Sequence, residues 1–166
     1  MNAGDTASFF DQRATVAEPV TVVIFGGAGD LAHRKLLPAL YNLHVDGALP
    51  PGTAVVGVGR KELTDEAFRA FARTGVEQFS RRALDPEQWA GFATSLFFAV
   101  ATLDSDAGLA SLGSRLDVIE HARGLTGNRI YYLAVPPPLF VPTVRQLAHA
   151  RFIGPPDRRP FSRLII

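Results

Sequence analysis

The sequence predicts a doubly wound α/β fold built on a mostly parallel sheet, and three observations predict it. Short, continuous apolar runs recur along the chain, as in strands that are buried on both faces of a parallel sheet. Segments with helical signals separate these runs, an alternation typical of βαβ units. A glycine-rich turn at residues 26–32 follows the first run, where such a fold begins its first helix.

Five apolar runs are predicted as strands. They comprise residues 20–25, 54–59, 96–101, 130–135 and 164–166. We expect the last strand to lack a helix that covers it, because the sequence printed here stops with that run.

The first helix is predicted at residues 31–46, with Gly47 ending it. Leu36, Leu40 and Leu43 share one of its faces. Pro38 has no backbone N–H and its ring clashes with the preceding turn, so we expect the helix to kink or restart there.

Capping residues predict the next two helices. Thr64 precedes an acidic first turn, and Asp85-Pro86 begins a short helix around Trp89. Residues 107–122 and 139–150 complete the alternation, and the proline-rich residues 154–160 are predicted as a loop. Residues 1–17 are expected to form a mobile tail, which leaves residues 18–166 as one domain.

Composition excludes several classes of function. With 17 Lys and Arg against 16 Asp and Glu, the chain has no broad basic field for nucleic acid or an anionic membrane. It has no apolar run long enough to span a membrane, and no secretory signal. The absence of cysteine excludes disulfides and thiolate metal sites. We therefore expect a cytoplasmic protein with no metal site.

The glycine-rich turn predicts a dinucleotide-binding site. Two patterns fit it, Gly26-x-x-Gly29-x-x-Ala32 and Gly27-x-Gly29-x-x-Ala32. The chemistry requires a first glycine for the tight turn, a second that lets the backbone approach the pyrophosphate, and a small third residue for helix–strand packing. The phosphates then lie at the N-terminus of the helix, against unpaired N–H groups. A glycine-rich turn that binds nothing is the alternative.

The end of the second strand favours NADP over NAD. NAD sites usually carry an acidic residue there, whereas NADP sites place an arginine near the additional phosphate. This chain has Gly57-Val58-Gly59-Arg60-Lys61, without an acid. Arg60 can bind a phosphate with its planar fork, and Lys61 adds a second positive charge.

Three blocks of sequence closely resemble the glucose-6-phosphate dehydrogenases. They are residues 26–43, which read GGAGDLAHRKLLPALYNL, residues 56–68, and residues 131–140. The resemblance implies a Rossmann-type coenzyme domain, which a larger α+β domain follows in the family. It also implies transfer of a hydride from C1 of glucose 6-phosphate to NADP, the step that enters the pentose phosphate pathway.

The resemblance assigns roles to individual residues. The cofactor diphosphate is assigned to the 26–32 turn and the 2′-phosphate to Arg60, with Ala101 and Thr102 near the adenine and Lys35 on the substrate side. The predicted cofactor-binding residues are Gly26, Gly27, Ala28, Gly29, Asp30, Leu31, Ala32, Arg60, Ala134 and Pro136. Ala28 replaces the Ser or Thr usual in the family, and residues 100–104 lack its usual Gly-Asp.

The resemblance also implies that parts of the family's active site are missing from these 166 residues. The family's Glu-Lys-Pro-Phe-Gly motif and its catalytic histidine would follow Ile166. His33, His44, His121 and His149 make no metal spacing and are expected at helix surfaces or ends. We therefore expect a truncated, monomeric NADP-binding domain with no catalytic residue, inactive alone, from a family of dimers or larger oligomers.

Two other functions stay open at this point. One is a stand-alone nucleotide-binding or regulatory module without chemistry. The other is a short-chain dehydrogenase, but none of Tyr41, Tyr131 and Tyr132 has a lysine four residues later, as that class requires.

Overall fold

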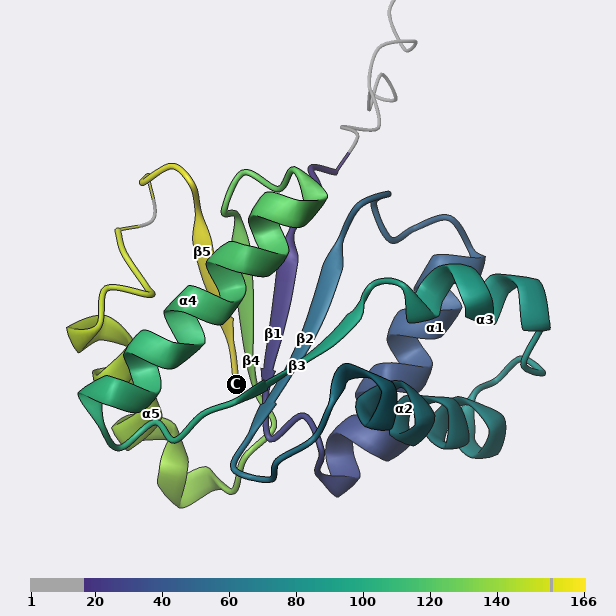
Figure 1. Cartoon of the computed structure of the whole chain (residues 1–166), viewed down its shortest axis with the longest axis horizontal. Helices are drawn as coiled ribbons and strands as arrows, with labels where there is room; N and C mark the ends of the chain where they lie inside the picture. Colours follow the sequence, from purple (N-terminus) through teal and green to yellow (C-terminus); the bar gives the residue numbers. More distant parts are fainter. Residues whose placement is uncertain (1–16, 156) are drawn as a thin grey trace, which may run out of the picture.

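The structure of the chain is a computed structural model that describes residues 17–155 and 157–166. Its sheet has five parallel strands in the order β3-β2-β1-β4-β5 (Figure 1). The strands are β1 (Thr21–Phe25), β2 (Ala54–Gly59), β3 (Leu96–Val100), β4 (Arg129–Leu133) and β5 (Ser162–Ile165). The predicted α/β fold is confirmed, while the predicted tail lies outside the described residues except for Ala17.

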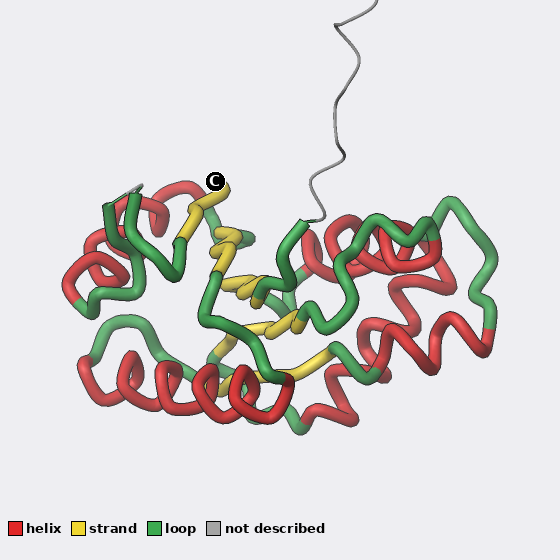
Figure 2. The backbone as a smooth tube through the Cα atoms, turned by 90° about the horizontal axis from the view of Figure 1, so that it is seen from above, coloured by secondary structure: helices red, strands yellow, loops and turns green. Residues whose placement is uncertain are grey.

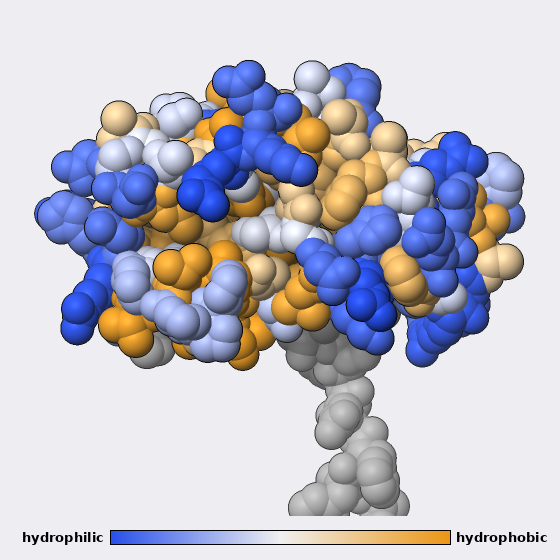
Figure 3. Space-filling model, turned by 90° about the horizontal axis from the view of Figure 1, so that it is seen from below, coloured by the Kyte–Doolittle hydropathy of each residue, from blue (hydrophilic) through white to orange (hydrophobic). Residues whose placement is uncertain are grey.

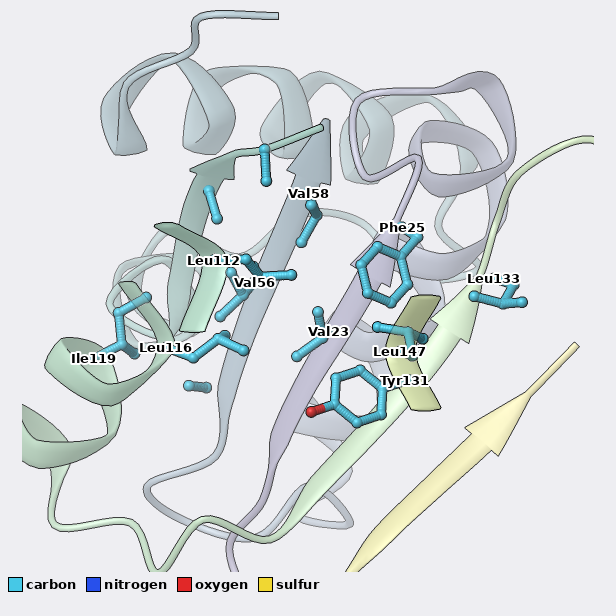
Figure 4. Close-up of a cluster of buried hydrophobic side chains, with 13 residues drawn as sticks. Val23, Phe25, Val56, Val58, Leu112, Leu116, Ile119, Tyr131, Leu133 and Leu147 are labelled. Atoms are coloured by element: carbon cyan, nitrogen blue, oxygen red, sulfur yellow. The ribbon is translucent and has the colours of Figure 1, made fainter. Parts of the chain in front are cut away.

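Helices cover both faces of this sheet (Figure 2). On one face, α1 (Leu37–Val45), α2 (Asp65–Phe79) and α3 (Pro86–Ala93) bury an aromatic core. On the other, α4 (Asp106–Arg123) and α5 (Phe140–His149) pack Leu112, Leu116 and Leu147 against β1, β2 and β4 (Figure 4). Apolar residues on both faces of the central strands explain their continuous apolar runs.

The first helix continues through the proline rather than restarting there, and its backbone adapts in the turn before Pro38. A π-helical turn, Ala32–Leu36, precedes α1, and Pro38 lies in the first turn of α1. The N–H of Leu37 donates to the carbonyl of Ala32, five residues earlier. The wider turn accommodates a residue that cannot donate its own helical hydrogen bond.

Both predicted caps are present. The Thr64 hydroxyl oxygen accepts the N–H of Ala67 at 3.1 Å, and an Asp85 carboxylate oxygen accepts the N–H of Gln88 at 2.8 Å. These bonds satisfy N–H groups that have no partner inside their own helices.

The strand β3 lies at one edge of the sheet. Side chains from α2 and α4 form hydrogen bonds with backbone groups of β3 at this edge. The N–H of Phe98 donates to Asp65 at 2.8 Å, and Arg115 donates to both oxygens of that carboxylate. Arg115 also reaches the carbonyl of Phe98, and Arg69 donates to the carbonyl of Leu96. Edge groups that could pair with another chain are thereby occupied.

The last strand differs from the prediction. It begins at Ser162 rather than Leu164, and it is not buried on both faces, since Ile165 remains 44% exposed. Because α4 and α5 lie on the opposite face, Ile165 and Tyr132 border an apolar groove beside Leu40 of α1. No helix among the described residues is long and apolar enough to cross a membrane.

Candidate functional site

A cleft of about 590 Å³ opens at the carboxyl ends of the strands. The ends of β1, β2 and β4 and the segment after β3 line it, together with the start of α5. It lies where the strand order reverses between β1 and β4, which is where open α/β sheets bind ligands. Figure 3 views the molecule from this side, where apolar surface lies between hydrophilic side chains.

Gly26 makes the tight turn after β1. Its φ of +79° lies in the left-handed region that favours glycine. A Cβ on Gly26 would lie 2.3 Å from the carbonyl oxygen of Ala134, too close for any side chain. The N–H groups of Gly26 and Gly27 both donate to the carbonyl of Val58, at 3.0 and 3.1 Å. The turn is therefore held against β2 and next to the segment after β4.

The other two glycines of the turn differ in their surroundings. Gly27 is buried, and a Cβ there would lie 2.4 Å from the Cα of Gly57 in β2. Gly29 lines the cleft, and a Cβ there would meet only Gly26 atoms, the nearest at 3.0 Å. Ala32 is fully buried under the turn. This geometry favours the pattern Gly26-x-x-Gly29-x-x-Ala32, with Gly27 as a packing residue.

Most of the predicted site residues come together in the cleft, and some do not. Asp30 points to solvent and pairs with Arg34 at 3.6 Å, and Lys35 is exposed on the π-helical turn. Gly27, Asp30, Leu31, Ala32 and Lys35 are outside the lining. The predicted residues that line the cleft are Gly26, Ala28, Gly29, Arg60, Lys61, Ala101, Thr102, Ala134 and Pro136.

Positive charge concentrates at the end of β2. Arg60 and Lys61 are exposed and line the cleft together, and Asp104 is the acidic residue of the lining. The described residues contain no cluster that could hold a metal ion. The four histidines lie on helices, where the sequence predicts them, and none of the four lines the cleft.

One wall of the cleft was not predicted from the sequence. Leu139, Pro142, Thr143 and Gln146, at and after the start of α5, face the strand ends. Their spacing of three or four residues marks one face of a helix, but the same spacing also fits a buried face. Only the packing of α5 beside the sheet shows which face meets the cleft.

A family model and several known proteins that are similar to this chain indicate the same family. The family model described as "Glucose-6-phosphate dehydrogenase, NAD binding domain" matches residues 23–166. Glucose-6-phosphate 1-dehydrogenase of Chlamydia pneumoniae is 39% identical over 150 residues, which are 89% of this chain and 29% of that protein. Glucose-6-phosphate 1-dehydrogenase 2 of Mycobacterium tuberculosis H37Rv is 34% identical over 151 residues, 91% of this chain and 29% of that protein.

Solved structures agree with the sequence matches. A glucose-6-phosphate dehydrogenase in complex with its substrate glucose-6-phosphate superposes with a TM-score of 0.75 at 27% identity, covering 91% of this chain and 30% of that one. The enzyme from Mycobacterium avium gives a TM-score of 0.71 at 25% identity, covering 88% of this chain and 29% of that one. The chain thus spans about 29% of the length of the relatives it matches.

Proposed function

The chain belongs to the glucose-6-phosphate dehydrogenase family, and on that premise we propose that residues 18–166 are the coenzyme-binding domain of such an enzyme and bind NADP. The observation that carries the proposal is the cleft, in which a glycine turn and Arg60 lie at the strand ends where the strand order reverses.

The glycine turn fits the pyrophosphate of the coenzyme. Gly29 lines the cleft and carries no side chain, so a phosphate can approach the backbone there. The first N–H groups of the helix that follows have no partners within the helix, and the helix dipole favours an anion at this end.

The strand order gives the orientation of the coenzyme in the cleft. Arg60 lies at the end of β2, so the adenosine half with its 2′-phosphate extends over β2 and β3. The nicotinamide half then extends toward Ala134 and Pro136, after β4. The nicotinamide accepts a hydride when the coenzyme is bound. Lys35, at the surface of the turn before α1, is assigned to the substrate side by family resemblance.

We propose that these 166 residues alone bind NADP without oxidising glucose 6-phosphate. Removal of a hydride from C1 requires a base within hydrogen-bond reach of the C1 hydroxyl. No histidine among residues 17–155 and 157–166 lines the cleft. Turnover of glucose 6-phosphate by the purified chain would contradict this part of the proposal.

Titration calorimetry with NADP and NAD tests the coenzyme assignment. We expect the wild-type chain to prefer NADP, and Arg60→Ala to lower its NADP affinity by about 1.5–3 kcal/mol, the contribution of a charged hydrogen bond, while NAD binding stays unchanged. Arg73→Ala, at an exposed surface ion pair on α2, is the matched control. An unchanged NADP affinity in Arg60→Ala would show that Arg60 does not bind the 2′-phosphate.

A further inference from the structure

Thr143 and Gln146 are the polar residues of α5 that line the cleft, and Gln146 carries a carboxamide. The residue is half-buried and lines the cleft, whereas its neighbour Leu147 is fully buried in the core. The backbone carbonyl of Gln146 already accepts a hydrogen bond from the N–H of Ala150. The carboxamide is therefore the polar group that Gln146 offers to the cleft.

The cleft lining places Gln146 near the adenosine end of the cleft. His149 Nε2 lies 3.9 Å from Asp106 Oδ1, so the last turn of α5 meets the first turn of α4. Gln146 precedes His149 by one turn, and residues 101–104 directly precede α4. Gln146 and residues 101–104 border the same cleft, and β3 ends beside β2, which carries Arg60.

We propose that Gln146 binds the adenine base of the coenzyme and selects adenine over other purines. The inference rests on the proposed function, in which Arg60 fixes the adenosine half at the end of β2. A carboxamide carries a donor and an acceptor side by side, so it can accept from the 6-amino group of adenine and donate to N7. Hypoxanthine presents acceptors at both positions, which leaves the carboxamide oxygen facing another acceptor.

The test compares NADP with its hypoxanthine analogue, in which an oxo group replaces the 6-amino group. Dissociation constants are measured by calorimetry on the 166-residue chain. We expect the wild type to prefer NADP about tenfold, within the range of a bidentate carboxamide–adenine pair. Gln146→Leu removes both hydrogen bonds at similar size, so we expect NADP to bind about tenfold more weakly and the analogue to bind as before.

Gln146→Glu keeps the shape of the side chain but cannot donate to N7, so it should bind NADP more weakly than the wild type does. Its carboxylate still accepts from the 6-amino group and opposes both acceptors of the analogue, so this variant should retain the preference for adenine. Gln78→Leu, at an exposed position on α2, is the matched control and should retain the wild-type ratio. Melting temperatures of all variants establish that each is folded.

The outcomes separate this inference from the proposed function. If the wild type does not bind NADP, the proposed function fails and this inference falls with it. If Arg60→Ala weakens NADP binding but the wild type shows no preference for adenine, the role of Gln146 alone is refuted. The same holds if Gln146→Leu retains the preference.

Discussion

Alanine at Gly27 and at Gly29 should affect different properties of the protein. The two glycines lie two residues apart in one turn, but Gly27 faces the backbone of β2 and Gly29 faces the cleft. Gly27→Ala is therefore expected to lower the stability of the fold. Gly29→Ala is expected to weaken coenzyme binding in a protein of almost unchanged stability.

The distances from each added Cβ to its neighbours set the expected change in the free energy of unfolding. A Cβ on Gly27 would lie 2.4 Å from the Cα of Gly57, and strand backbone cannot rotate away as a side chain can. We expect a loss of about 3 kcal/mol, the upper end for overpacking. A Cβ on Gly29 would lie 3.0 Å from the carbonyl oxygen of Gly26. That crowding opposes the ~0.4–1 kcal/mol gained when alanine restricts the unfolded chain, so the net change should stay near zero.

Thermal unfolding and calorimetry measure the two effects separately. Gly27→Ala should lower the melting temperature by about 10 °C, given a shift of about 2–4 °C per kcal/mol in a domain of this size. Gly29→Ala should bind NADP at least about tenfold more weakly, because its methyl group separates the phosphate from a backbone donor. The reasoning is refuted if the two variants exchange behaviour, with Gly29→Ala unstable and Gly27→Ala stable but unable to bind.

Three further changes test the packing behind the cleft. Burial raises the pKa of Tyr131 to about 12, whereas an unfolded tyrosine titrates near pH 10, so the free energy of unfolding should fall as pH rises from about 10 to about 12. Urea titrations of Tyr131→Phe should show no such fall. Glu120→Ala removes a buried carboxylate that receives two hydrogen bonds from the half-buried Arg129, and urea titration should show a loss of about 3 kcal/mol or more. A loss below about 1 kcal/mol would contradict this. Asp85→Ala removes the cap of α3 and should cost about 1 kcal/mol in thermal unfolding, whereas Glu87→Ala in the same turn should have little effect.

Local chemistry is sufficient to predict much of this fold. The caps at Thr64 and Asp85 and the altered helical turn before Pro38 each depend on residues within one turn of the chain. The strand ends are less well determined by local signals. The apolar run at residues 130–135 predicts six strand residues, but β4 ends at Leu133 and the chain then enters the cleft.

Long-range packing limits what the sequence predicts of the site. The glycine pattern is compatible with Gly26 or Gly27 as the turn residue. The positive φ of Gly26 and the proximity of Gly27 to Gly57 in β2 distinguish them. The α5 wall with Gln146 was missed for the same reason, since it depends on how α5 meets α4. The position of Arg60 after β2 was predicted because it follows from counting along the chain.

The occupied edge of β3 has a consequence for how the chain could aggregate. Three side chains hold that edge, Asp65 and Arg69 from α2 and Arg115 from α4, and these helices pack on opposite faces of the sheet. A fluctuation that moves one helix still leaves backbone groups of β3 bonded by the other. Intermolecular strand pairing at β3 therefore requires both helix layers to detach, so pairing through this edge involves a largely unfolded chain rather than a native-like one.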